Sequence, residues 1–413
     1  MINWPLVIDK LIWFFTVLLF CSFYIFSANT ASRFILFGIT IIIFGLMLIR
    51  NNGRIPLYWH TFHKGVSIFA FFCFLSYFWS ISPTETLIRS SVILQIAICM
   101  SVLYCHYVNR RDTSALVKVI IFGGYLVALY SIFFYGIDNI KSIISSAKRL
   151  DNAFANVNSI SRLMAVSSVA VIYQIVFEKF KWYHLAVIIN IFILIATGSK
   201  TGIILFVVGT SAVFFARYSK KNWVYSLLNY IIIVLLVFLV LRILMELPIF
   251  EGLTKRMNRF FDLFSQGSMM RGSDATRYWM IRVGWQEFLE HPLLGVGLGS
   301  SGDLLAQAIG RRTYLHNNYI ELLSGGGLIG TFLYYSLLVI PGMQLFKQRA
   351  YHFANNYFCL ILILLMFLMD IMGVSYTSKN FYFYIMLIFI QVQINKRMIK
   401  QMNGNNVNEQ KQK

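Results

Sequence analysis

Residues 115–136 read ALVKVIIFGGYLVALYSIFFYG, and this stretch decides the fold class of the chain. It carries a single charged side chain, Lys118, over the length of about 20 residues that a helix needs to cross a bilayer. Similar apolar runs recur along the whole 413-residue chain. They lack the two-residue alternation of a membrane β-barrel, and lipid cannot satisfy loose backbone groups, so each run is predicted to be a helix.

The composition excludes a water-soluble globular protein. Hydrophobic residues make up 58% of the chain and charged residues 13%, about half the charged share of soluble domains. The net charge of +20 is spread over loops that flank the apolar runs, which argues against a basic nucleic-acid-binding domain. The five cysteines lie in or beside apolar runs without paired spacing, so neither a disulfide framework nor a zinc site is expected. They are Cys21, Cys73, Cys99, Cys105 and Cys359.

The sequence therefore predicts an all-α polytopic integral membrane protein with about 12 transmembrane helices. One long extracytoplasmic loop is predicted between helices 9 and 10. The expected segments are 1–246 for helices 1–9, 247–317 for this loop, 318–395 for helices 10–12 and 396–413 for a basic tail. The predicted spans are 6–27, 34–49, 65–81, 87–106, 115–136, 159–177, 183–197, 201–216, 224–245, 319–340, 353–371 and 381–395.

The short loops predict the orientation, because Lys and Arg accumulate on the cytoplasmic side of a membrane protein. An even number of spans and the positions of these residues agree if both termini are cytoplasmic. The basic residues assigned to that face are Lys10, Arg50, Arg54, Lys64, Arg110, Arg111, Lys118, Lys179, Lys181, Arg217, Lys220, Lys221, Lys347, Arg349, Lys396, Arg397, Lys400, Lys411 and Lys413.

The remaining basic residues fall on the outer side, many of them in the loop 247–317. Since long loops cross the membrane regardless of charge, most of these cations are expected to be ordinary solvated side chains. The alternative is that several converge on a polyanion, with phosphate as the obvious candidate. Those outside the loop include Lys141, Lys148, Arg149 and Arg162 before the sixth helix and Lys200 at a hairpin tip.

Part of the long loop is predicted to be helical. Ser273 or Asp274 can cap a helix that the pair His291-Pro292 would end. Its aromatic and aliphatic positions make a rough stripe, which favours a helix lying on the membrane or plugging the bundle. The glycine run 292–299 follows. A tight turn is its favoured use over an anion site, because no strand precedes it and the spacing matches neither phosphate-loop pattern.

Several motifs around this loop resemble the O-antigen ligase and polymerase superfamily. They are Arg277 followed by the Pro292-Leu293-Leu294-Gly295-Val296-Gly297 element, His316-Asn317-Asn318-Tyr319-Ile320 at the start of the next predicted helix, and Gly327-Leu328-Ile329-Gly330. The chain departs from the family pattern at Ile281, where a Trp is usual, and at Gly325-Gly326-Gly327, where Glu-x-Gly is common. A Ser-Arg pair typical of the family is here Ser199-Lys200, and Arg149…Asn158 matches weakly.

The resemblance implies a location in the bacterial cytoplasmic (inner) membrane. It also implies transfer of a glycan from an undecaprenyl-pyrophosphate carrier to an acceptor hydroxyl on the outer face of that membrane. His316 is the candidate base. Arg277 and Lys200, with Arg149 behind them, are the candidate pyrophosphate-binding cations, and Glu321 either orients His316 or forms an ion pair. Nothing in the outer loops resembles an Asp-x-Asp metal clamp. We therefore expect no metal and no cofactor.

Several functions remain open. A polymerase in O-antigen, capsule or exopolysaccharide synthesis is slightly favoured over a ligase to lipid A core or a protein O-oligosaccharyltransferase, because of Lys200 and the loose match at Ile281. The partners are then the carrier-linked glycan, an acceptor glycan or lipid, and the bilayer, with no nucleic acid. A flippase is a different class, but no duplicated half is visible. A scaffold protein gives no reason for a basic outer loop.

Overall fold

The computed structural model describes most of the chain. The described residues are 3–26, 31–54, 59–146, 149–152, 154–218, 228, 231–232, 235, 273–351 and 353–411. Within these ranges the regular structure is entirely helical. The all-α prediction is confirmed to that extent.

Eight helical segments are long and apolar enough to cross a membrane. They comprise α1 (Trp4–Ile25), α2 (Ala31–Arg50), α3 (Thr61–Leu75) with the short helix Ser76–Trp79, α4 (Pro83–Arg110), α5 (Thr113–Tyr135), α7 (Val157–Phe177), α9 (Lys200–Tyr218) and α14 (Asn318–Lys347).

The other predicted spans have different outcomes. The seventh and eleventh correspond to shorter apolar helices, α8 (Val187–Thr197) and α15 (Asn356–Ile371). The twelfth forms part of α16 (Lys379–Lys411), a helix that continues through most of the predicted basic tail. The ninth, 224–245, lies outside the described residues except for four isolated positions. The total of 12 spans and the limits of the long loop therefore stay predictions.

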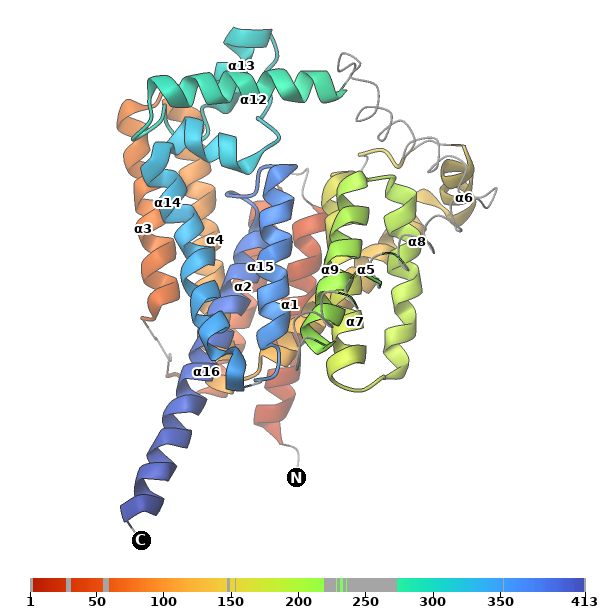
Figure 1. Cartoon of the computed structure of the whole chain (residues 1–413), viewed down its shortest axis with the longest axis vertical. Helices are drawn as coiled ribbons and strands as arrows, with labels where there is room; N and C mark the ends of the chain where they lie inside the picture. The colour runs from red at the N-terminus through yellow and green to blue at the C-terminus, as the bar shows by residue number, and fades with distance from the viewer. Residues whose placement is uncertain are drawn as a thin grey trace.

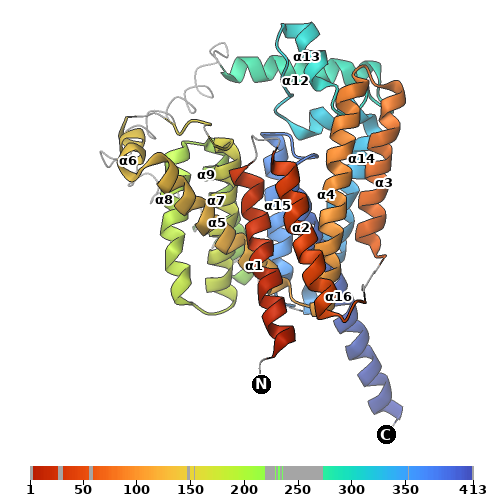
Figure 2. The ribbon, with the colours of Figure 1, turned by 180° about the vertical axis from the view of Figure 1, so that it is seen from behind.

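The two ends of the bundle differ in what they carry. Helix α1 begins and α16 ends at one end, whereas α12 (Ser273–Glu290) and α13 (Ser301–Ile309) lie across the other (Figures 1 and 2). Polar contacts join the helix ends on the terminal side: Asp9 binds Arg50, and Asn355 donates to Thr113. Short α6 (Ile137–Ser145) lies on the side of α12, as Figure 1 shows. The end that carries α12 and α13 is called the loop end below.

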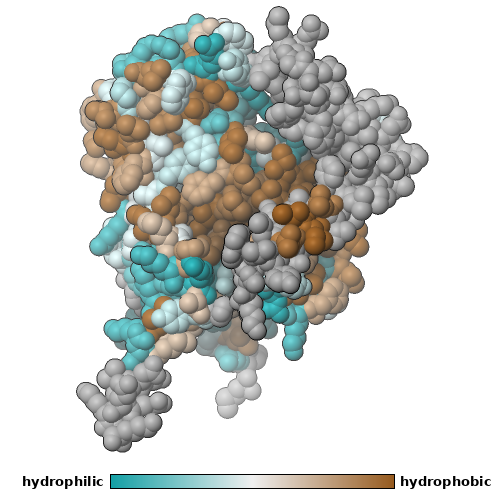
Figure 3. Space-filling view, in the orientation of Figure 1, coloured by the Kyte–Doolittle hydropathy of each residue, from teal (hydrophilic) through white to brown (hydrophobic). Residues whose placement is uncertain are grey.

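The surface between the two ends is apolar. Figure 3 shows hydrophobic side chains across the middle of one face, with hydrophilic residues gathered toward the lower end. Large side chains such as Phe133, Phe34 and Phe332 are more than 70% exposed in the isolated chain. Such a belt would be unstable in water, and lipid is the solvent that suits it.

Candidate functional site

Helix α12 is held at the loop end by a small apolar cluster. Met280 is buried with Leu315 and with Leu305 of α13, and Val283 and Ile320 pack against them. Gly284 in α12 adds to this close packing, because a Cβ there would lie 2.6 Å from Ile320 Cγ2. The residues that face the bundle are therefore small or aliphatic.

This packing corrects the predicted stripe of α12. The helix does end at Glu290, just before His291-Pro292. Its Trp279, Trp285 and Leu289 are exposed, so the aromatic positions point away from the protein and are available to a membrane surface. Arg277 lies three residues before buried Met280 and seven before Gly284. It therefore shares their helix face and is half-buried.

The glycine run after α12 forms the turns that lead from α12 to α13. Gly295, Gly297 and Gly299 have φ values of 64°, 95° and 96°, which side chains rarely tolerate. A Cβ on Gly295 would lie 2.5 Å from the carbonyl oxygen of Ser324 in α14, and the Val296 amide donates to that carbonyl. The run is thus used for tight turns and close packing, as the sequence favoured.

The same run explains the triple glycine in α14. The helix is interrupted at Gly327, whose φ and ψ are 60° and −162°. The freed amides of Leu328 and Ile329 donate to the carbonyls of Pro292 and Leu293. The preceding loop therefore supplies carbonyl partners for the backbone amides that the break in α14 leaves free.

His316 stands at the junction between this loop and α14. Its φ of 57° is uncommon for a residue with a side chain. Hydrogen bonds hold the backbone on both sides. The Leu315 amide donates to Glu321 Oε2 at 3.0 Å, and Asn317 caps α14 by accepting from the Ile320 amide at 3.1 Å. The His316 ring lies against the Tyr314 ring, with centroids 4.0 Å apart.

Glu321 positions this junction without touching the His316 ring. Its second oxygen accepts a hydrogen bond from Ser301 Oγ at 2.6 Å, and its side chain is buried. Within the described chain it forms no ion pair. The structure therefore favours an indirect orienting role, through the Leu315 backbone, over an ion pair.

Asn318 ties the start of α14 to the loop between α15 and α16. Its Oδ1 accepts from the amides of Ser375 and Tyr376, and its Nδ2 donates to Asp370 Oδ2 at 3.1 Å. Asp370 also accepts from Tyr335 and Ser375. Every polar atom of the Asn318 side chain is thus engaged, so its role is to fix the loop that faces His316.

A cavity of about 370 Å³ lies in front of His316. Residues from α4, α7, α13, α14 and the loop before α16 surround it. The polar lining includes Glu85, Arg89, Asn156, Asn158, Ser159, Arg162, Ser301, Arg312, Thr313, Tyr314, His316, Glu321, Tyr376, Thr377, Ser378 and Asn380.

One wall of the cavity has balanced charge. Arg312 contacts Glu85 at 3.3 Å and Asp303 at 3.1 Å, and Arg89 lies 4.0 Å from Glu85. These groups satisfy one another, so this wall can support the α4–α13 contact without a ligand.

The cavity lining also includes Arg162, one of the basic residues that the sequence places on the outer side. Arg162 lies in the second turn of α7, and its Nη2 donates to the Met372 carbonyl at 3.0 Å. Its Nε is buried with no hydrogen-bond partner among the described residues. Gly373 leaves just enough room for the guanidinium, since a Cβ there would collide with it. A charged residue inside a predicted span was the signal that could have identified it.

Arg277 does not line the cavity but lies close enough to His316 for its charge to act on the ring, and Arg149 lies close enough to Arg277 to be affected by it in turn. Burial, and secondly the charges of Arg277, Arg311 and Arg162, lower the pKa of His316 to about 4. Burial also lowers the pKa of Arg149, with Arg277 as the second cause. Within the described residues neither Arg149 nor Arg277 is paired with a carboxylate. The structure therefore gathers cations around a neutral imidazole.

Lys200 does not line the cavity and is linked to it through its neighbour Ser199. It begins α9 beside Ser199, whose hydroxyl donates to Asn158 Oδ1 at 3.3 Å. Arg149 donates to the same oxygen at 2.7 Å, and Asn158 lines the cavity. Of the five predicted site residues, His316 and Glu321 line the cavity. Arg277 acts on His316 by its charge, Arg149 contacts the lining residue Asn158, and Lys200 follows Ser199, which contacts Asn158 too.

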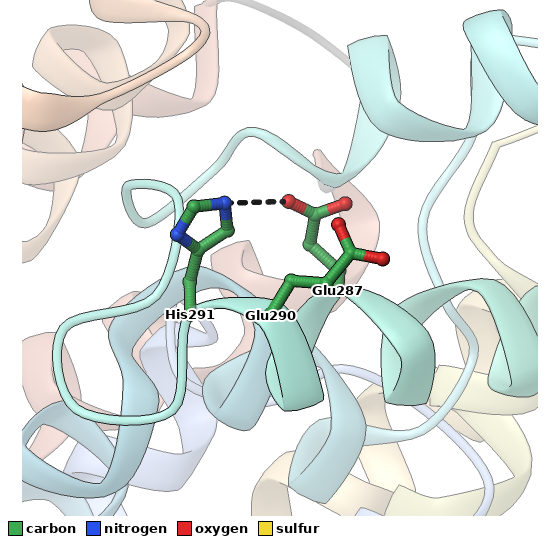
Figure 4. A group of neighbouring side chains, drawn as sticks. All are labelled: Glu287, Glu290 and His291. Carbon is green, nitrogen blue, oxygen red and sulfur yellow. Dashed lines mark ion pairs between the residues drawn. The ribbon is translucent and has the colours of Figure 1, made fainter.

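One group among the described residues has the composition of a metal site. Glu287 and Glu290 lie in the last turn of α12 and His291 directly follows the helix, with ligand atoms within 4.8 Å of one another (Figure 4). Glu287 Oε1 is 3.7 Å from His291 Nε2. Both Glu290 and His291 are exposed and none of the three lines the cavity, so nothing connects this group to His316.

These helices and this cavity define a polytopic helical membrane protein with a cationic site at one end. Residues 185–335 match the protein-family model described as O-antigen ligase, an enzyme family of glycosyl transfer. The match confirms the resemblance to the O-antigen ligase and polymerase superfamily. It includes Lys200, Arg277 and His316, whereas Arg149 and Arg162 precede it. No curated protein matches the chain.

Proposed function

We propose that the chain transfers a glycan from a polyprenyl-pyrophosphate carrier, undecaprenyl pyrophosphate in bacteria, to an acceptor hydroxyl at the outer face of the cytoplasmic membrane. The observation that carries this proposal is a cavity lined by both His316 and Arg162, whose Nε is buried without a partner among the described residues, with the charge of Arg277 also acting on the His316 ring. A pyrophosphate leaving group needs stabilisation of growing negative charge, and an acceptor hydroxyl needs a base.

The residues fit one displacement step. The acceptor oxygen bonds to the anomeric carbon of the donor sugar, and the bond from that carbon to the pyrophosphate oxygen breaks. The electron pair leaves with the pyrophosphate, beside the arginines. A His316 nitrogen accepts the hydroxyl proton. Guanidinium groups suit this task because they offer planar paired donors to phosphate oxygens.

The charge of the donor also bears on the strength of the base. A pKa of about 4 makes His316 a weak base in the empty protein. A bound pyrophosphate adds negative charge near the same ring and opposes the effect of the three arginines. The base is therefore expected to strengthen when the donor binds, toward the range that favours proton transfer at neutral pH.

Substitution tests the site assignment. Arg277→Ala and His316→Ala should abolish transfer and leave membrane insertion intact, because both residues lie outside the candidate spans. Arg282→Ala is a matched control, since Arg282 is an exposed cation of the same helix as Arg277, does not line the cavity and is not among the charges that act on His316. Near-normal product from both site variants would overturn the assignment.

The acceptor is resolved by a second assay. Incubation with carrier-linked repeat units alone should give a ladder of longer lipid-linked chains if the protein is a polymerase, the activity that we favour. Product that needs added lipid A core or a protein acceptor means a ligase or an O-oligosaccharyltransferase. In liposomes, passage of the donor across the bilayer without a new glycosidic bond means a flippase and contradicts the proposal.

A further inference from the structure

A second cavity lies at the opposite end of the bundle, away from His316. Its volume is about 260 Å³, and its lining residues are all polar: Arg50, Asn51, His106, Asn109 and Arg110. Arg50 ends α2 and Arg110 ends α4, so the cavity lies where these helices reach the boundary of the predicted membrane region.

The charges around this cavity do not balance. Asp9 in α1 binds Arg50 with Oδ1 at 2.8 Å and Arg110 with Oδ2, so two guanidinium groups share one buried carboxylate. Asp112 caps α5 at the Ala115 amide, and Arg111 lies beside it in the chain. Counting all five groups, one positive charge remains. Each paired arginine keeps about a third of its side chain exposed.

His106 adds a second, independent observation. It lies in α4 one turn before Arg110 and is only 5% exposed, yet it lines the cavity. Within the described residues its imidazole forms no hydrogen bond, and its ring contact is with Tyr107. The ring nitrogens are not enclosed by the protein, so a group that enters the cavity can form a hydrogen bond with them.

We propose that this cavity binds the phosphate of an anionic phospholipid. Arginine forks recognise phosphate oxygens, and basic pockets between helices at a membrane boundary bind acidic lipid headgroups. The surrounding surface suits the rest of such a lipid. Ile49, next to Arg50, is 66% exposed, and Leu6 and Trp4 are exposed where α1 begins. Trp is typical of this depth. The site is independent of the proposed transfer reaction.

The test uses the purified full chain and native mass spectrometry of bound lipid. Phosphatidylglycerol is compared with phosphatidylcholine of the same acyl chains, and glycerol phosphate is the soluble competitor. Asn109→Asp places a negative charge in the cavity without removing any packing. Asn52→Asp is the control for the same chemical change, because Asn52 is exposed, lies two residues beyond the end of α2 and does not line the cavity.

The expected result is selective retention of phosphatidylglycerol by the wild type, weakened about fivefold or more in Asn109→Asp and unchanged in Asn52→Asp. One charge near an anionic lipid contributes about 1 kcal/mol, which is about fivefold in affinity. Equal retention by both variants, or equal loss from both, overturns the site. Competition by glycerol phosphate at concentrations as low as those of the lipid overturns the assignment to a lipid headgroup.

Discussion

His316 is expected to remain a neutral base far below the pH at which an ordinary histidine becomes charged. Burial and the nearby arginines lower its pKa to about 4, and a base acts in its neutral form. At about pH 5, a group with this pKa is about 90% neutral, whereas one with the usual pKa of about 6.5 is only about 3% neutral. Since kcat/KM reports the free enzyme, it should keep about nine-tenths of its plateau at about pH 5.

The assay measures the initial rate of polyprenyl-pyrophosphate release at low donor concentration and constant ionic strength. The rate is measured at a series of acidic pH values. Arg311→Gln supplies the internal control. It removes one charge that lowers the pKa of His316, so the acid limb of kcat/KM should move to higher pH while the plateau stays. A wild-type limb near pH 6.5 would refute the reasoning, as would a shift of the Arg311→Gln limb to lower pH.

Three further predictions concern the same end of the molecule. Arg277→Lys should lower the rate of polyprenyl-pyrophosphate release by about 10²-fold or more, because a single ammonium group cannot reproduce the paired donors of a guanidinium. A wild-type rate in this variant would contradict the prediction. Gly373→Ala should raise the KM for the donor, because the added Cβ displaces the Arg162 guanidinium. Arg162→Gln should raise this KM at least as much. A normal KM in both variants excludes Arg162 from donor binding. Met280→Ala should loosen α12 by about 2 kcal/mol or more, seen as faster hydrogen exchange in α12 with α5 unchanged; equal exchange in α12 argues against the cluster.

The helices could be predicted from the sequence because the length of an apolar run and the residues that end a helix are local features. Residues 115–136 were predicted to span, and α5 covers Thr113–Tyr135. The end of α12 before His291-Pro292 followed from the restriction that proline imposes on the preceding residue. Both features depend on neighbours in sequence rather than on tertiary packing.

The cavity could not be predicted in the same way, because its walls come from segments far apart in the chain. Arg162 lies in the predicted span 159–177, but the sequence does not reveal that the Met372 carbonyl and Gly373 hold its guanidinium in place. The indirect role of Glu321 depends on a bond to the Leu315 amide that spacing alone does not reveal. The buried face of α12 carries aliphatic rather than aromatic residues, and at Gly284 it lies close to Ile320 and Leu315. This close packing is a tertiary contact that the sequence does not reveal.

The central claim is that the cationic cavity beside His316 couples departure of a lipid pyrophosphate to formation of a glycosidic bond. The most direct measurement counts polyprenyl pyrophosphate released and glycosidic bonds formed by the purified protein and by its His316→Ala variant. We predict one carrier released for each bond made by the wild type and neither product from the variant. Equal turnover by the variant, or movement of intact donor with no bond made, would contradict the account.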